Sequence, residues 1–113
     1  MNMEDIKKLC KNKKLRWTNH IFIRLIQRNI NISDVVYAIM NGEIIEKYPD
    51  DYPYPSCLIL GMNINNESLH IVCGINNNIE LHLITVYYPN ATEWTNDFKR
   101  RVNIAENGEE NNQ

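Results

Sequence analysis

The sequence is poor in the residues that bend or cross-link a polypeptide. Of its 113 residues, four are glycine, four are proline and three are cysteine. Three cysteines are an odd number for a disulfide framework, which indicates a reducing compartment, and we expect a cytoplasmic protein. Cys57 and Cys73 stand within apolar, strand-like segments, where we expect small buried side chains. No four ligands stand at the short spacing of a zinc site.

Long apolar runs and the common catalytic motifs are also missing. No run approaches the about 20 residues that a membrane-spanning helix needs, and the N-terminus lacks the apolar core of a secretory signal. We therefore expect no membrane association. A glycine-rich phosphate loop, an HExxH zinc motif and a nucleophile elbow are absent, and Ser33 stands where it would cap a helix. We expect neither a metal nor another cofactor.

Positive charge is concentrated at the N-terminal end. Residues 1–28 carry eight basic and two acidic side chains, a net charge of +6, whereas the other 85 residues carry four basic and 12 acidic ones, a net charge of −8. A cationic end on an acidic protein favours contact with a polyanion. The alternative is a lysine-rich helix whose charges are simply solvated.

Apolar spacing predicts several helices. The strongest pattern begins after Thr18, a natural N-cap. Its apolar arc consists of Ile21, Phe22, Leu25 and Ile26. We predict helices over residues 3–12, 19–28, 34–41 and 93–102, with a brief strand or connector at 15–17.

From residue 43 the period changes to that of strands. Three prolines exclude a strand between Pro49 and Pro55, and the asparagines at 76–78 are turn sequence. The last two strands should therefore form an antiparallel hairpin. We predict strands over residues 43–48, 56–62, 69–75 and 79–88.

The hairpin register decides which side chains share a face. With a three-residue loop, His70 lies opposite Ile84. His70 and His82 then share one face of the sheet, while Thr85 and Tyr87 lie on the other face.

Helices followed by a meander of strands indicate an α+β fold. We predict N-terminal helices packed on one antiparallel four-stranded sheet, together with a C-terminal helix, as a single domain over residues 1–102. Residues 103–113 are polar and acidic without periodicity, and we expect them to be a disordered tail.

His20, Arg24 and Arg28 form the sharpest functional pattern. Residues four apart stack on one face of a helix, so these side chains make a cationic stripe that contains no acidic residue. Clustered cations favour an anion, and phosphate suits a guanidinium well. The pattern predicts contact with phosphate or RNA. Alternatively, Glu43 or Glu46 from another element pairs with the arginines.

Further candidates stand in the C-terminal half. The strand residues His70 and His82 either pack within the sheet or act as general base or acid, because histidine titrates near neutral pH. Tyr87, close to Thr85 near the end of the last strand, either belongs to the core or stacks on a nucleotide. The basic residues that either hold phosphates or cap their helix are Lys99, Arg100 and Arg101.

Taken together, five segments resemble a known bacterial family, the "domain of unknown function four-two-five-eight". They are Trp17-Thr18-x-His20-x3-Arg24-x3-Arg28-x-Ile30, Asn41-Gly42-Glu43-Ile44-Ile45-Glu46-x-Tyr48-Pro49, Cys57-Leu58-Ile59-Leu60-Gly61, Leu69-His70-Ile71-Val72 and Thr85-Val86-Tyr87-x-Pro89. The resemblance extends over residues 15–102. The chain departs from the family pattern at Ile21, where a small residue is usual, and at Asn29, where glycine is usual.

The resemblance implies a fold similar to the RelE/ParE-like toxins, small α+β proteins with helices on one face of an antiparallel sheet. Many of these toxins are ribonucleases that act on messenger RNA, often at the ribosome, and others act on targets such as DNA gyrase. It also implies an antitoxin partner, often a YgiT-type zinc-finger protein. The positions that match the family pattern are His20, Arg24, Arg28, His70, Thr85 and Tyr87.

We therefore expect the toxin component of a type II toxin–antitoxin system, a metal-independent endoribonuclease. His20 or His70 would be base or acid, Arg24 and Arg28 would stabilise the pentavalent phosphate, and Tyr87 would orient or stack a base. The expected RNA-binding residues are Thr85, Lys99, Arg100 and Arg101. The alternative is a non-catalytic module that binds a protein partner or target without cleaving RNA.

Overall fold

The computed structural model describes residues 1–77 and 79–102, so the expected tail at 103–113 lies outside the described residues. The elements in chain order are α1 (Met3–Lys11), β1 (Leu15–Arg16), α2 (Asn19–Gln27), α3 (Ile32–Asn41), β2 (Glu43–Tyr48), β3 (Ser56–Met62), β4 (Ser68–Asn76) and β5 (Glu80–Tyr87). No helix within the described ranges has the length and apolar character needed to cross a membrane.

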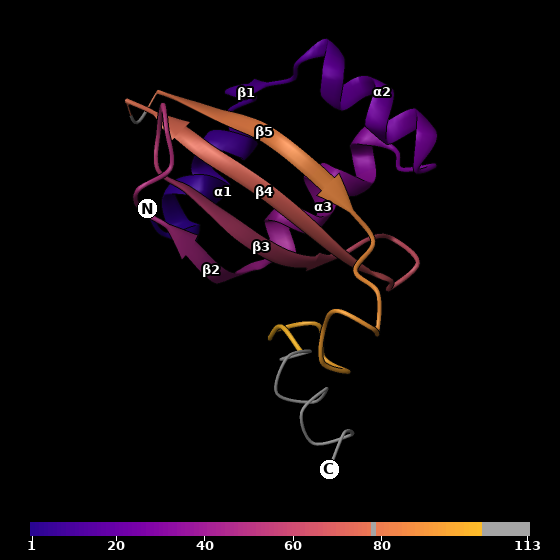
Figure 1. The fold of residues 1–113 in the computed structure, drawn as a ribbon. Helices are drawn as coiled ribbons and strands as arrows, with labels where there is room; N and C mark the ends of the chain where they lie inside the picture. Colours follow the sequence, from indigo (N-terminus) through magenta and orange to yellow (C-terminus); the bar gives the residue numbers. More distant parts are fainter. Residues whose placement is uncertain (78, 103–113) are drawn as a thin grey trace.

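The strands form one mixed sheet in the order β1-β5-β4-β3-β2 (Figure 1). Strands β2 to β5 pair antiparallel, whereas β1 pairs parallel to β5. The prediction of a four-stranded antiparallel sheet is therefore wrong. Leu15 and Arg16 pair with Leu81 and His82, and the N–H of Leu81 donates to the carbonyl of Lys14 at 2.8 Å. Two residues are too few to show the alternation that identifies a strand.

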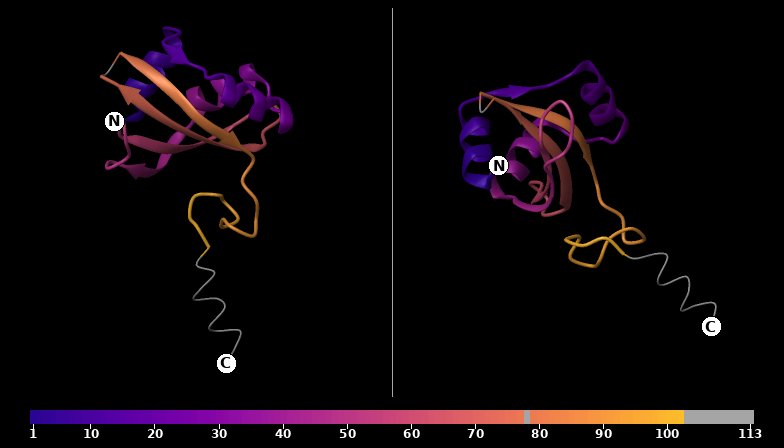
Figure 2. Two further views of the ribbon diagram at one scale, coloured as in Figure 1. Left: turned by 45° about the horizontal axis from the view of Figure 1, so that its top comes forward. Right: turned by 60° about the vertical axis from the view of Figure 1, so that its left-hand side comes forward.

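Helices α1, α2 and α3 lie on one side of the sheet (Figures 1 and 2). Their buried residues pack on alternate residues of the central strands, which is the arrangement expected when helices cover one face of a sheet. Cys57 and Cys73, expected to be buried, face each other in this core with their sulfur atoms 3.9 Å apart. The core includes Ile6, Ile21, Leu25, Val35, Ile39, Ile59, Leu69, Ile71, Leu81, Leu83 and Val86.

Strand β5 contains a bulge that changes the predicted register. Val72 pairs with Thr85, but the next residue of β4 pairs with Leu83, which leaves Ile84 without a partner. An extra residue on one strand shifts the alternation of faces beyond it. Thr85 and Tyr87 therefore lie on the same face as His82, which we call the open face because no helix of the described residues covers it.

The predicted opposition of His70 and Ile84 is wrong for two reasons. The turn of the hairpin lies one residue later than predicted, with Asn76 opposite Glu80, which moves the partner of His70 by two residues, and the bulge moves it by one more. His70 pairs with Tyr87, so these two side chains share the open face instead of lying on opposite faces. The bulge thus brings together two residues that the sequence separates.

The predicted helix at 93–102 is also absent. After β5 the chain leaves the sheet and makes a series of turns over residues 89–102, here called the C-terminal segment (Figures 1 and 2). Trp94 forms an isolated β-bridge with Arg101 and is buried on the open face. Trp94, Leu58 and Leu60 are buried without belonging to the core on the helical side.

Local side-chain bonds explain why this segment is not helical. The hydroxyl of Thr95 accepts from the N–H of Arg100 at 3.3 Å, and the carboxylate of Asp97 accepts from the N–H of Lys99 at 3.1 Å. Phe98 adopts a left-handed backbone with φ of 59°. Short polar side chains that bond nearby amides compete with helical hydrogen bonds.

Gly61 sets how closely α3 approaches the sheet. A Cβ at this position would lie 2.0 Å from the carbonyl oxygen of Ala38, which belongs to the backbone of α3. Backbone cannot rotate away as a side chain can, so any larger residue must push α3 off β3.

We expect Gly61→Ala to lower the free energy of unfolding by about 3 kcal/mol or more, because overpacking a rigid contact is costly. Denaturant unfolding measures the change. Asn65→Ala, at an exposed turn position, is the control and should leave stability nearly unchanged. Equal midpoints for Gly61→Ala and the wild type would contradict this account of the α3–β3 contact.

Candidate functional site

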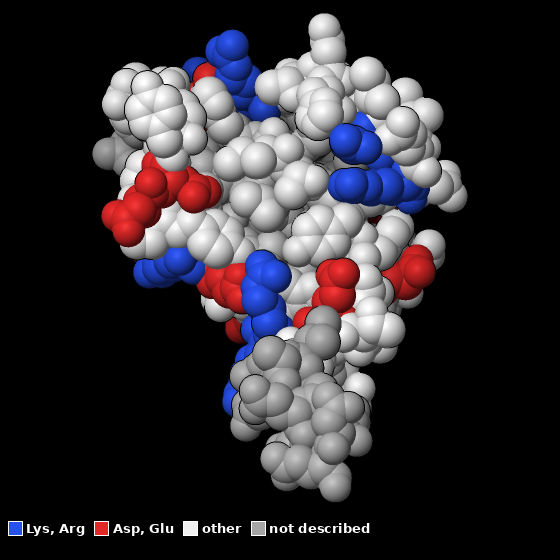
Figure 3. Space-filling view, viewed as in Figure 1, with Lys and Arg blue, Asp and Glu red and all other residues white. Residues whose placement is uncertain are grey.

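Helix α2 presents the predicted cationic stripe. Thr18 caps it as predicted, since its hydroxyl accepts from the N–H of Ile21 at 3.2 Å. Buried Ile21 and Leu25 fix the rotation of the helix, which leaves His20 and Arg24 exposed to solvent. On the face of the molecule in Figure 3, Lys and Arg side chains gather where α2 lies, apart from the acidic side chains.

The apolar arc of α2 is only half covered. Ile21 and Leu25 are buried as the arc predicts, but Phe22 is 37% and Ile26 is 80% exposed. Ile23 is exposed as well. Helix α2 thus carries an uncovered apolar flank, made of Phe22, Ile23 and Ile26.

Arg28 lies at the end of α2 and is bonded to β5. Its Nη1 donates to the carbonyl of Val86 at 2.7 Å and to the hydroxyl of Thr85 at 3.2 Å. Because β1 pairs only with the first part of β5, the second part is a strand edge, and Arg28 occupies that edge. Arg28 therefore both adds positive charge and fastens α2 to the sheet.

Within the described ranges, no acidic residue pairs with the stripe. Glu43 pairs instead with Lys99, at 3.0 Å, and Glu46 pairs with Arg101, at 3.0 Å. Pairing of Glu43 or Glu46 with Arg24 or Arg28, the alternative interpretation of the stripe, is therefore wrong.

The three basic residues of the C-terminal segment differ in their surroundings. Lys99 and Arg101 are engaged by acidic residues of β2, and Arg101 also lies over the ring of Trp94, at 4.7 Å from its centre. Arg100 is exposed and pairs with no acidic residue in the described part of the chain. Arg100 is thus the one of the three with its charge available to a ligand.

His70 is buried between Tyr87 and the C-terminal segment. Its Nε2 lies 2.9 Å from the carbonyl oxygen of Phe98, and its Nδ1 lies 3.2 Å from the hydroxyl of Tyr87. A carbonyl can only accept, so Nε2 carries the proton and Nδ1 accepts from Tyr87. Trp94 packs edge-on against the imidazole, with ring centres 4.4 Å apart.

This setting favours a neutral imidazole. Burial lowers the pKa of His70, although the carbonyl of Phe98 and the charge of Glu46 act in the opposite direction. Burial also raises the pKa of Tyr87. His70 is therefore a neutral residue that positions the Tyr87 hydroxyl and does not itself meet solvent.

The end of β5 is where predicted site residues converge. Thr85 bonds Arg28 of the α2 end, and Tyr87 bonds His70 of β4. Residues from three elements therefore meet at the stretch of β5 from Thr85 to Tyr87. His82 lies apart, since it belongs to the other end of β5, packs edge-on against Tyr54 and has its Nε2 3.3 Å from Glu80.

Tyr48 and Trp94 also belong to this region, although the sequence did not mark them as site residues. Partial burial raises the pKa of Glu46, but hydrogen bonds from Arg101 and Tyr48 outweigh it, and the pKa is lowered overall. Burial and the bond to Glu46 raise the pKa of Tyr48 to about 12. Glu46 and Tyr48 stand two residues apart on one strand, and such residues share a face of the sheet. This spacing could have predicted their contact.

Among the residues that the structure describes, no three of His, Cys, Asp or Glu lie close enough together to hold an ion. The chemistry available here is that of imidazole, phenol and guanidinium groups.

His70 should make stability depend on pH. Because its folded pKa lies below the ordinary value of 6.5, the unfolded chain binds this proton first as the pH falls. Its contribution to the free energy of unfolding is complete above about pH 6.5 and is lost as the pH falls towards the folded pKa. Denaturant unfolding between pH 7 and pH 5 should show this loss in the wild type.

His70→Gln removes the titrating group, so its unfolding free energy should depend less on pH over the same range. His20→Gln is the matched control, because His20 is exposed, and it should retain the slope of the wild type. Equal slopes for the wild type and His70→Gln would contradict the assignment.

Comparison with known proteins supports the resemblance in part. The family model "Domain of unknown function (DUF4258)" matches residues 17–88. No curated protein and no solved structure matches the chain. The matched residues run from Trp17 to Tyr88 and contain the stripe, His70 and the bulged strand β5, but neither α1 nor the C-terminal segment. Since the match covers more than half of the chain, the protein belongs to the DUF4258 family.

Proposed function

We propose that this protein is a RelE/ParE-like toxin of a type II toxin–antitoxin system, which cleaves messenger RNA in the cytoplasm without a metal. The observation that carries the proposal is the cationic stripe on α2. His20 and Arg24 are exposed without an acidic partner in the described ranges, and Arg28 extends the stripe to β5. Exposed cations in one row suit the evenly spaced phosphates of RNA.

RNA cleavage without a metal requires two proton transfers and a stabilised phosphorane. A base removes the 2′-hydroxyl proton, the 2′-oxygen attacks phosphorus, and the departing 5′-oxygen receives a proton. His20 is the exposed imidazole that can exchange these protons, while Arg24 and Arg28 offset the charge that develops on the phosphate. Tyr87, held by His70, presents its ring at the end of β5 for a base to stack upon.

His20→Ala and Arg24→Ala should each abolish growth arrest and transcript cleavage in bacteria that express the chain. Loss of a general base costs about 10²–10⁴-fold in rate, and loss of a transition-state cation about 10²–10³-fold. Cleavage of a defined messenger RNA by purified protein, with and without ribosomes, measures the rates. Arg28→Ala is less suitable, because it also releases α2 from β5.

Lys47→Ala is the matched control, since it removes an exposed positive charge from β2, away from the stripe. It should cleave RNA like the wild type. Unchanged cleavage by a folded His20→Ala/Arg24→Ala double variant would refute the assignment of the site.

A second candidate function is that of a non-catalytic module that binds a protein partner. Besides the apolar flank of α2, exposed Ile32 and Met40 border an apolar groove of about 570 Å³ on the helical side. Lys11 and Lys13 also line this groove. Exposed apolar surface bordered by cations favours an acidic amphipathic partner, and the antitoxin is the candidate, for instance a YgiT-type zinc-finger protein.

We expect Ile26→Glu to weaken binding to a co-expressed antitoxin of this type, because it places a charge on the apolar flank. Isothermal titration with the purified pair measures the affinity. Ile79→Glu, also at an exposed position but on the β4–β5 hairpin, should bind normally. The double variant His20→Ala/Arg24→Ala should also bind the antitoxin normally. If the double variant loses binding and Ile26→Glu does not, the partner binds the stripe and not the apolar flank.

A further inference from the structure

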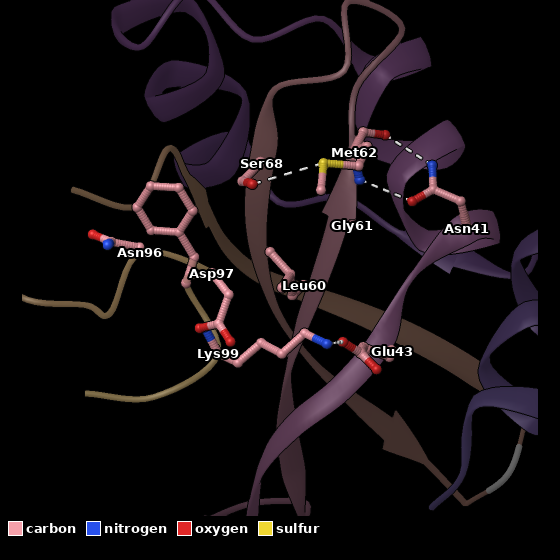
Figure 4. Close-up of a pocket in the computed structure, with 10 residues that line it drawn as sticks. Asn41, Glu43, Leu60, Gly61, Met62, Ser68, Asn96, Asp97 and Lys99 are labelled. Carbon is pink, nitrogen blue, oxygen red and sulfur yellow. Dashed lines mark hydrogen bonds and ion pairs between the residues drawn. The ribbon is translucent and has the colours of Figure 1, made fainter. Parts of the chain in front are cut away.

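A cavity of about 390 Å³ lies between the C-terminal segment and the sheet (Figure 4). This volume falls within the range of small-ligand sites. One wall comes from the ends of α3 and β3 and the start of β2 and β4, and the opposite wall comes from the C-terminal segment. The residues that line it include Glu43, Leu60, Met62, Ser68, Asn96, Asp97, Phe98 and Lys99.

The cavity has an apolar interior with an aromatic side. Leu60 and Met62 supply aliphatic and thioether groups from β3, and Phe98 supplies a ring from the C-terminal segment. The backbone of Phe98 is held twice, since its N–H donates to the carbonyl of Thr95 at 2.8 Å and its carbonyl accepts from His70 at 2.9 Å. These two bonds hold the backbone from which the ring of Phe98 projects.

The rim of the cavity is polar and offers both donors and acceptors. The ammonium group of Lys99 reaches across to Glu43 at 3.0 Å and closes one end (Figure 4). Asp97 uses Oδ1 for bonds within its own turn, which leaves Oδ2 without a partner in the described ranges. Asn96 lies at the rim and is exposed, so its amide can donate and accept.

We propose that this cavity binds a nucleobase of single-stranded RNA. Apolar side chains together with one aromatic ring suit base stacking, and a rim of amide, carboxylate and ammonium groups suits the donors and acceptors of a base edge. Exposed Arg100, two residues after Phe98, can meet the adjoining phosphate. The inference rests on the proposed function and adds a base-binding site to it.

The cavity is linked to the candidate active site through one residue. Phe98 contributes its ring to the cavity and its carbonyl to His70, which in turn bonds Tyr87. A base seated against Phe98 therefore stabilises the conformation that holds the Tyr87 hydroxyl.

The first test measures the affinity of a short single-stranded RNA for the full chain that carries His20→Ala, so that the RNA stays intact. Phe98→Leu in this background keeps apolar volume but removes the aromatic ring. We expect about tenfold weaker binding of RNA, the loss typical of one stacked base, and unchanged binding of an abasic oligomer of the same length. Tyr52→Leu is the matched control, because it removes an exposed aromatic ring elsewhere, and it should change neither affinity.

RNA affinity that is unaffected by Phe98→Leu but weakened by Arg24→Ala would overturn the base site and leave the proposed function standing. Equal weakening of RNA and of the abasic oligomer would also overturn it, because the effect would then concern the phosphates.

A second measurement separates the base site from RNA cleavage. Methyl signals of Leu60 and Met62 are followed by NMR while the four nucleoside monophosphates are added, with ribose 5-phosphate as the control. Shifts with nucleotides alone support the base site even if the chain cleaves no RNA, in which case only the proposed function fails. No shifts with any nucleotide would overturn the base site, and the cavity would then suit a side chain of a protein partner.

Discussion

The bulge at Ile84 is the constraint on which the candidate site depends. Without an extra residue in β5, strict alternation would place Thr85 and Tyr87 on the helical side, in the core. With it, the hydroxyl of Tyr87 meets His70 on the open face, and Thr85 lies within reach of Arg28. One unpaired residue therefore decides which side chains can act together.

The C-terminal segment gives His70 a structural role in the described conformation. Trp94 and the carbonyl of Phe98 cover the imidazole and fix its tautomer, so the proton of Nε2 is already committed. A buried, fully bonded imidazole is a poor first candidate for proton exchange with a substrate. The exposed residues of the stripe, His20 and Arg24, become the better candidates, and His70 becomes a residue that positions Tyr87.

The basic side chains of this protein fall into two groups, those paired with acidic residues and those of the exposed stripe. Glu43 and Glu46 engage Lys99 and Arg101, which fasten the C-terminal segment to β2. The two acidic residues considered as partners of the stripe are thereby paired elsewhere. Each of these exposed ion pairs contributes little to stability. Their main consequence is that Glu43 and Glu46 do not neutralise the positive charge of the stripe.

The sequence by itself determined the elements whose side chains repeat with a clear period. The helical arc around Ile21 and Leu25 follows from spacing, because burial of one helix face imposes that spacing. Strands β3 and β4 follow from their short apolar runs, since most of their residues are buried on both faces of the sheet. Tertiary structure alone decided the bulge at Ile84, since a bulge exists only relative to a partner strand. It also decided the C-terminal segment, where Trp94 and the residues after it have helical spacing, but local hydroxyl and carboxylate bonds and the burial of Trp94 against His70 prevail.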